Sequence, residues 1–212
     1  MTRPETTAKL SYMLEKKINP YNDPRIYWAK EVTFDYSTNH AVRVDYMKFV
    51  PVNNSVSGIE KGDFYCYEIK SSVEDFRSGH GLNFIGDYNY LVMPTDVCAV
   101  VSLEIPHYVG IYVPEANDLA CIKKAKRRNR TRPASEMLLM MFRSANRDCR
   151  KAVKQLEEMK KMADKTCKTC VENDNGLCDR KGILIEEDDT CEKHTENWKE
   201  TMMENFIRKS MW

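Results

Sequence analysis

The stretch that decides the fold is Asp63-Phe64-Tyr65-Cys66-Tyr67-Glu68-Ile69-Lys70, an apolar strand that ends in two charges. Side chains two residues apart on a strand point to the same side of the sheet, so we expect Glu68 and Lys70 side by side. The following Ser71-Ser72 predicts a turn that opens a short helix. Charges at the end of a buried strand need partners, and these partners have to come from neighbouring strands.

The segments around this strand predict a mixed α/β sheet domain of about a hundred residues, because strand patterns alternate with helical ones. Ala41–Val50 is expected to alternate, with Val44 and Tyr46 on one face and Asp45 and Met47 on the other. The other expected strands are Glu31–Tyr36, Asn89–Met93, Val109–Val113 and Leu119–Lys123, and the expected helices are Thr6–Ile18 and Val97–Leu103.

Asp45, Glu68 and Lys70 form the most informative set of charges. Asp45 lies within an otherwise apolar strand that we expect to pair with the strand of Glu68. Two carboxylates that face each other across adjacent strands repel unless a positive charge lies between them, and Mg²⁺ is bound by such oxygens. A lysine beside them can polarise an attacking water, so the set suits phosphodiester hydrolysis. A plain salt bridge between Glu68 and Lys70 is the alternative.

The run from Glu68 to Arg77, with Arg43-Val44-Asp45 before it and Tyr88–Pro94 after it, resembles the MmcB-like branch of the PD-(D/E)XK nuclease superfamily. The resemblance covers about half of the chain and implies a restriction-endonuclease-like α/β core. It also implies that Asp45 and Glu68 bind Mg²⁺ or Mn²⁺ and that Lys70 assists the attacking water. Glu31 matches an extra acidic ligand, for which Glu15 competes, and Val44 replaces the proline of the family motif.

A dense basic run follows the last expected strand. Seven of the ten residues from 123 to 132 are cations, and none is acidic. Such a run favours the phosphate backbone of nucleic acid without sequence preference, although it can also be a solvated face. The predicted nucleic-acid-binding residues are Lys123, Lys124, Lys126, Arg127, Arg128, Arg130 and Arg132.

Four of the eight cysteines cluster near the end of the chain, as Cys167, Cys170, Cys178 and Cys191. A Cys-x2-Cys pair with two further cysteines is typical of a structural zinc site, with an iron–sulfur cluster as the second possibility. His194 is an alternative to one thiolate. A segment this short, with few apolar residues, is not expected to fold without such a metal.

A long helix is predicted between the sheet domain and the cysteines, beginning at Pro133 and Ser135. Its apolar residues recur in steps of four and three, from Leu138 and Phe142 to Ala163. This stripe has to pack either on the sheet domain or on a second copy of the chain. The prediction therefore divides the chain into a nuclease-like domain (1–132), a long amphipathic helix (133–165) and a metal lobe with a final helix (166–212).

The composition is that of a globular protein, with 42% hydrophobic and 31% charged residues and a net charge of +1. The absence of a signal-like or membrane-spanning segment predicts a cytoplasmic protein without a membrane partner. The expected function is that of a metal-dependent deoxyribonuclease acting on DNA, with RNA as the alternative substrate, in a bacterial or phage-infected cell. The alternatives are a nucleic-acid-binding module that does not cut, and an interaction protein that dimerises through residues 138–163.

Overall fold

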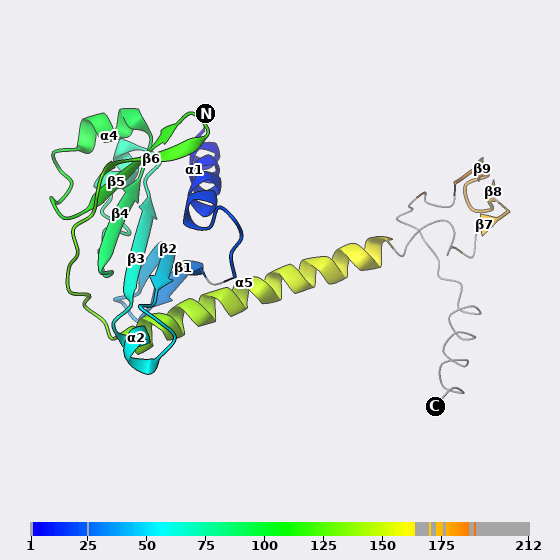
Figure 1. Cartoon of the computed structure of the whole chain (residues 1–212). Coiled ribbons are helices and arrows are strands. Elements are labelled where there is room, and N and C mark those ends of the chain that lie inside the picture. The colour runs from blue at the N-terminus through cyan, green and yellow to red at the C-terminus, as the bar shows by residue number, and fades with distance from the viewer. Residues whose placement is uncertain are drawn as a thin grey trace. The chain divides into compact units, whose positions relative to one another are not determined.

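The computed structural model describes residues 2–24, 26–163, 170, 173–175, 177–186 and 189 (Figure 1). The chain forms two compact units, Met1–Asp148 and Cys149–Trp212. None of the described helices combines the length and the apolar composition that a membrane span requires. The first unit holds the sheet and all of the residues around the predicted carboxylates.

A six-stranded mixed sheet forms the centre of the first unit, with the strands in chain order across it. The first three strands are antiparallel to one another, the third to fifth run parallel, and the last returns antiparallel. The strands are β1 (Tyr27–Phe34), β2 (Val42–Val50), β3 (Asp63–Ile69), β4 (Tyr88–Val92), β5 (Gly110–Glu115) and β6 (Asp118–Lys123).

Helices cover both faces of this sheet. Helix α1 (Arg3–Ile18) begins with a capping box between Thr2 and Glu5 and buries its apolar side against the tyrosines of β2, β3 and β4. The opposite face is covered by α4 (Thr95–Val101) and by the beginning of α5 (Ala134–Ala163). The short helices α2 (Val56–Glu60) and α3 (Val73–Arg77) precede and follow β3. The result is a three-layered α/β unit in which β3 is central.

The mixed α/β fold, its strand pattern and its long helix confirm the fold class expected from the sequence at this level. Three details were wrong. Strand β1 begins at Tyr27 rather than at Glu31, and helix α2 forms between β2 and β3, where no helix was predicted. The regular alternation expected for β2 was also wrong, because Val44 and Met47 share one core cluster while Tyr46 belongs to another. The change of face occurs at Asp45.

Helix α5 is continuous, but the side that packs most closely on the sheet is offset from the predicted stripe, of which Leu138 is partly buried against the same core cluster. Ala134, Met137, Met141 and Ser144 are buried, whereas Phe142 of the stripe is 68% exposed. The spacing of the buried residues is also three and four, so periodicity alone did not distinguish the two sides. Helix packing is fixed instead by contacts that the sequence does not reveal, including a hydrogen bond from Ser144 Oγ to the carbonyl oxygen of Lys30.

The second unit contains a small antiparallel sheet of three two-residue strands. These are β7 (Asn173–Asp174), β8 (Leu177–Cys178) and β9 (Ile183–Leu184), in chain order. Cys178 is buried, and its carbonyl oxygen accepts a hydrogen bond from Gly182 N at 2.7 Å. Cys170 similarly accepts one from Asn173 N, so each of these two cysteines begins a tight turn.

Candidate active site

The two predicted acidic residues meet where the ladder between β2 and β3 ends. The last paired residues are Tyr46 and Tyr67, so Asp45 and Glu68 come next and oppose each other. At this point side-chain carboxylates take the place of the backbone carbonyl oxygens of the strand ladder. Asp45 Oδ2 accepts a hydrogen bond from Ile69 N at 2.9 Å, and Glu68 Oε2 lies 3.5 Å from Asp45 N. The opposition expected from the sequence is therefore present.

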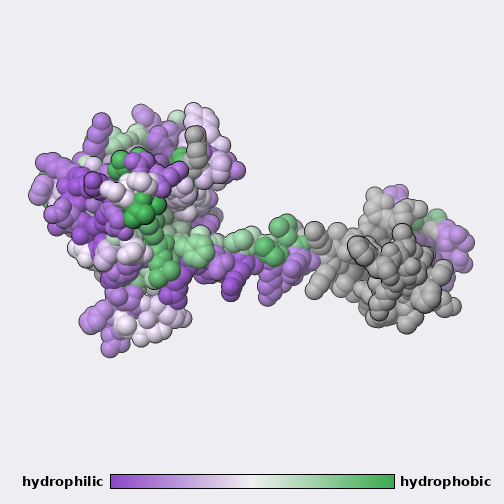
Figure 2. Space-filling view, turned by 60° about the horizontal axis from the view of Figure 1, so that its bottom comes forward, coloured by the Kyte–Doolittle hydropathy of each residue, from purple (hydrophilic) through white to green (hydrophobic). Residues whose placement is uncertain are grey.

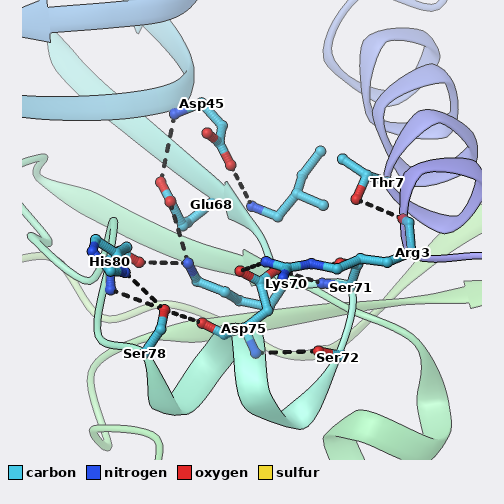
Figure 3. A network of polar contacts seen from close by, with 11 residues as sticks. Arg3, Thr7, Asp45, Glu68, Lys70, Ser71, Ser72, Asp75, Ser78 and His80 are labelled. Carbon is cyan, nitrogen blue, oxygen red and sulfur yellow. Dashed lines mark hydrogen bonds and ion pairs between the residues drawn. The ribbon is translucent and has the colours of Figure 1, made fainter.

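Lys70 lies beside Glu68, as the strand spacing predicted. Its Nζ is 3.5 Å from Glu68 Oε1, and its side chain is almost fully buried. The same Nζ donates to the carbonyl oxygen of His80, so the loop after α3 holds the lysine (Figure 3). His80 therefore contributes to the site through its main chain, while its exposed imidazole contacts Ser78.

Gly81 is a site residue that sequence reasoning missed. Its φ of 74° lies in the left-handed region, which favours glycine. A Cβ atom at this position would lie 1.5 Å from Glu68 Oε1. The only signal in the sequence was the Gly79-His80-Gly81 pattern, which suggested a loop but not a contact with Glu68.

Burial makes ionisation of the carboxylates unfavourable. The pKa of Glu68 is raised to about 8, chiefly by burial and secondly by the neighbouring charge of Asp45, while Lys70 acts in the opposite direction. Burial also raises the pKa of Asp45, although the hydrogen bond from Ile69 N opposes this effect. Two buried carboxyl groups that share one lysine form a site short of positive charge, which a bound cation would supply.

Both carboxylates line a polar cavity of about 710 Å³. Its walls come from β1, β2, the end of β3, the loop around His80 and one side of α1. Figure 3 shows Arg3 of α1 reaching across this region to Asp75, with a distance of 2.7 Å between Arg3 Nη2 and Asp75 Oδ1. The charged residues of the wall are Arg3, Lys30, Glu31, Arg43, Asp45, Glu68, Lys70 and Asp75.

The turn after β3 is tied together by Asp75, which was also missed. Its carboxylate accepts a hydrogen bond from Ser71 N at 3.0 Å, and its own N–H donates to Ser72 Oγ at 3.1 Å. The predicted capping role of Ser72 is thereby confirmed. Because Arg3 binds the same carboxylate, the N-terminal turn of α1 is linked to the end of β3.

Glu31 also lines the cavity, from an unusual place in β1. The pairing of β1 with β2 passes from Lys30↔Tyr46 to Val32↔Val44, and Glu31 between them has a φ of 55°. Helix α5 holds this distortion, since Arg147 donates hydrogen bonds to the carbonyl oxygens of Glu31 at 3.1 Å and Lys30 at 3.0 Å. The competing Glu15 instead accepts a hydrogen bond from the Tyr46 hydroxyl at 2.9 Å.

The carboxylate oxygens of Asp45 and Glu68 suit one hard cation that takes few of its ligands from the protein. Asp45 and Glu68 supply oxygens from two sides, and Mg²⁺ commonly takes one or two carboxylates together with waters and phosphate oxygens. Glu31 does not join this pair of acids, because its Oε2 is 3.0 Å from Arg43 Nη1 and the two form an ion pair. Among the described residues, no three His, Cys, Asp or Glu side chains gather as a ready metal site. Asp45 and Glu68 thus fit a divalent ion as a pair.

The basic run lies away from this cavity. Arg127 Nε is 3.0 Å from Asp63 Oδ1, at the opposite end of β3 from Glu68. Arg130 pairs with the buried Asp87 at 3.0 Å, and Arg132 pairs with Asp35 and Glu136. Lys123 donates to the carbonyl oxygen of Pro106, and Arg128 lies over the ring of Tyr108. The side chains of Lys124, Lys126 and Arg128 have no hydrogen-bond or ion-pair partner among the described residues.

The predicted zinc ligands fall only partly within the described part of the chain. Cys170 and Cys178 are free thiols there. Cys167, Cys191 and His194 lie outside the described residues. The two turns that begin at Cys170 and Cys178 are the local feature that the cysteine spacing required.

No family model matches the chain, and neither does any curated protein. Among solved structures, it is similar to SPO1766, a protein of unknown function from Silicibacter pomeroyi. The two chains are 15% identical, with a TM-score of 0.46, and the match covers 72% of this chain and 90% of that one. The function is therefore inferred from the cavity itself.

Proposed function

We propose that the protein is a Mg²⁺- or Mn²⁺-dependent nuclease that hydrolyses DNA phosphodiester bonds. The observation that carries this proposal is the opposition of Asp45 and Glu68, with Lys70 Nζ 3.5 Å from Glu68, in a cavity of about 710 Å³. A cavity of this size is in the range of small-molecule sites and admits a nucleotide unit. The sequence resemblance to the PD-(D/E)XK superfamily points to the same three residues.

The balance of charge supports the binding of a cation. Arg3 is paired with Asp75, and Arg43 is paired with Glu31. Among the described residues, Lys70 forms the ion pair with Glu68 and no cation forms one with Asp45, and both of these carboxyl groups have a raised pKa. A divalent ion supplies the missing charge without a change in the fold.

The residues have distinct roles in the proposed reaction. Asp45 and Glu68 would hold the metal ion, which supplies charge to polarise a phosphoryl oxygen and to acidify an attacking water. The ammonium group of Lys70 lies beside Glu68, where it orients that water and stabilises the developing negative charge. The loop around Gly81 fixes the Glu68 carboxylate.

A cleavage assay tests this proposal. Supercoiled plasmid, linear duplex, single-stranded DNA and RNA are each incubated with the purified protein in Mg²⁺, Mn²⁺ or EDTA. Lys70→Met removes the charge but keeps much of the side chain's volume, and we expect it to lower the cleavage rate by at least about a hundredfold. Lys61→Met, an exposed lysine before β3, is the matched control and is expected to cleave like the wild type.

The outcomes separate the proposed nuclease from its alternatives. Metal-dependent cleavage that Lys70→Met abolishes and Lys61→Met retains supports the proposal. Salt-sensitive nucleic-acid binding without cleavage by any form overturns it in favour of a binding module. Neither binding nor cleavage leaves an interaction protein, and a melting curve for each variant excludes misfolding as the reason.

For the second unit we propose a structural zinc ion bound by Cys167, Cys170, Cys178 and Cys191. The support is the cysteine spacing, together with the turns at Cys170 and Cys178 and the burial of Cys178. Metal analysis of protein purified without added zinc should give one equivalent, and Cys178→Ser should lose it. Iron in place of zinc would show an iron–sulfur cluster instead.

Association of two copies through α5 remains a proposal for the helix between Leu138 and Ala163. Hydrophobic residues recur along α5 in Figure 2, and Phe142 and Leu156 of the predicted stripe are exposed. Exposed apolar residues in steps of four and three are typical of a coiled-coil seam. Light scattering should give twice the monomer mass for the wild type and the monomer mass for Leu156→Glu, whereas a monomeric wild type would exclude this dimer.

A further inference from the structure

A second cavity, of about 230 Å³, adjoins the first and is not used by the proposed reaction. The two cavities share Glu31 and Thr33 of β1 as a common wall. Neighbouring strands lie about 5 Å apart, so this wall is about 10 Å from the strand of Glu68. A strand of nucleic acid with one phosphate beside Glu68 would therefore cross β1 toward the second cavity.

The far side of the second cavity is formed by α5, which presents Arg143 and Arg147 one turn apart. Arg147 is engaged, because it binds the carbonyl oxygens of Lys30 and Glu31 and the carboxylate of Asp148. Arg143 is exposed and forms no ion pair or hydrogen bond within the described part of the chain. Its positive charge is thus available to a ligand.

Two further side chains complete the surroundings of Arg143. Thr33 contributes a hydroxyl group, and Tyr36 is 74% exposed although it is aromatic. Glu31 also lines this cavity, and its negative charge is compensated by Arg43, with 3.0 Å between Glu31 Oε2 and Arg43 Nη1. A cation, hydroxyl groups and an exposed aromatic ring are the components with which proteins bind phosphate and stack a base.

We propose that Arg143, Thr33 and Tyr36 form a subsite for a flanking backbone phosphate of the nucleic-acid substrate. This inference rests on the proposed function, because the strand that it binds is the one that reaches Asp45 and Glu68. It assigns the phosphate contact to α5, whereas Arg127, Arg130 and Arg132 of the basic run are engaged with acidic residues.

The test is the binding of a fluorescein-labelled oligonucleotide, single-stranded or duplex, measured by anisotropy in Ca²⁺ and in EDTA over a series of salt concentrations. Arg143→Ala should weaken binding about three- to tenfold and reduce the slope of log K against log salt by about 0.7 to 0.9. Alanine is the best helix former, so this change should not disturb α5. Arg150→Ala, at another exposed position of the same helix, is the matched control and should bind like the wild type.

Affinity for Mn²⁺, measured on the same variants, distinguishes this inference from the proposed function. Arg143→Ala should leave Mn²⁺ affinity unchanged, since Arg143 does not touch Asp45 or Glu68. If the wild type binds and cleaves DNA but Arg143→Ala does so equally well, the subsite is wrong and the nuclease stands. If the subsite variant loses binding in a protein that never cleaves, the subsite stands and the nuclease is wrong. No binding by the wild type overturns both.

Discussion

The two ends of β3 carry similar numbers of acidic residues, but these residues are compensated differently. At its beginning, Asp63 and the buried Asp87 are neutralised by Arg127 and Arg130. Asp87 Oδ2 also accepts the N–H of Phe64 at 2.9 Å. At its end, Glu68 is paired with Lys70, and Asp45 forms no ion pair with any of the described residues.

The difference indicates which end is structural and which is functional. Acids with a full complement of cations and hydrogen bonds stabilise the fold, and they have no capacity for a further cation. Acids with too few cations are costly to ionise, and a protein retains such a cluster where a ligand completes it. Three predictions test this contrast, in order of expected effect.

The largest effect is expected from Arg130→Met, which leaves Asp87 buried with less compensation. Asp87 is 2% exposed, and removal of one partner from a buried ion pair typically costs about 3 kcal/mol or more. Chemical denaturation should show this loss, and Lys124→Met in the same run should show almost none. Equal stability of the two variants would mean that the ion pair between Arg130 and Asp87 at the beginning of β3 does not stabilise the fold.

A smaller loss is expected from Gly81→Ala. Its Cβ would collide with Glu68, in addition to the strain of the left-handed backbone, so we expect about 1–3 kcal/mol of destabilisation and loss of Mn²⁺ binding. Gly79→Ala is matched, because Gly79 has the same φ of 74° but nothing within 4 Å of the new atom. Calorimetric Mn²⁺ titration should show binding only in the Gly79 variant; binding by both would mean that Glu68 is not a ligand.

The smallest effect, of opposite sign, is expected from Glu68→Gln in metal-free protein. Because the folded-state pKa of Glu68 is raised to about 8, the wild type should gain stability as the pH falls from about 8 toward the ordinary value of 4.5. The glutamine variant carries no such charge and should be more stable above pH 8, on the order of 1 kcal/mol. Melting temperatures across this pH range test it, and a wild type that loses stability on acidification would contradict it.

The sequence predicted the strands and the meeting of Asp45, Glu68 and Lys70, because strand periodicity and pairing are local rules. It did not predict the parts that close the site. Gly81, Asp75 and Arg3 reach it from a loop and two helices, and their contacts depend on tertiary packing. The basic run shows the same limit, since a linear count of cations does not reveal that Arg130 is engaged with Asp87.

The hold of α5 on Glu31 has a consequence for how the chain can be altered. Ser144 and Arg147 belong to the same compact unit as β1, and this unit ends at Asp148. From Cys149 to Glu158 every described residue of the helix is exposed. Insertions or deletions of helical turns after Asp148 should therefore be tolerated by the carboxylates, whereas a single residue added between Ala134 and Ser144 would rotate the arginine by about 100° and release β1. The first half of the helix sets the register of the site, and the carboxylates place no limit on the length of the second half.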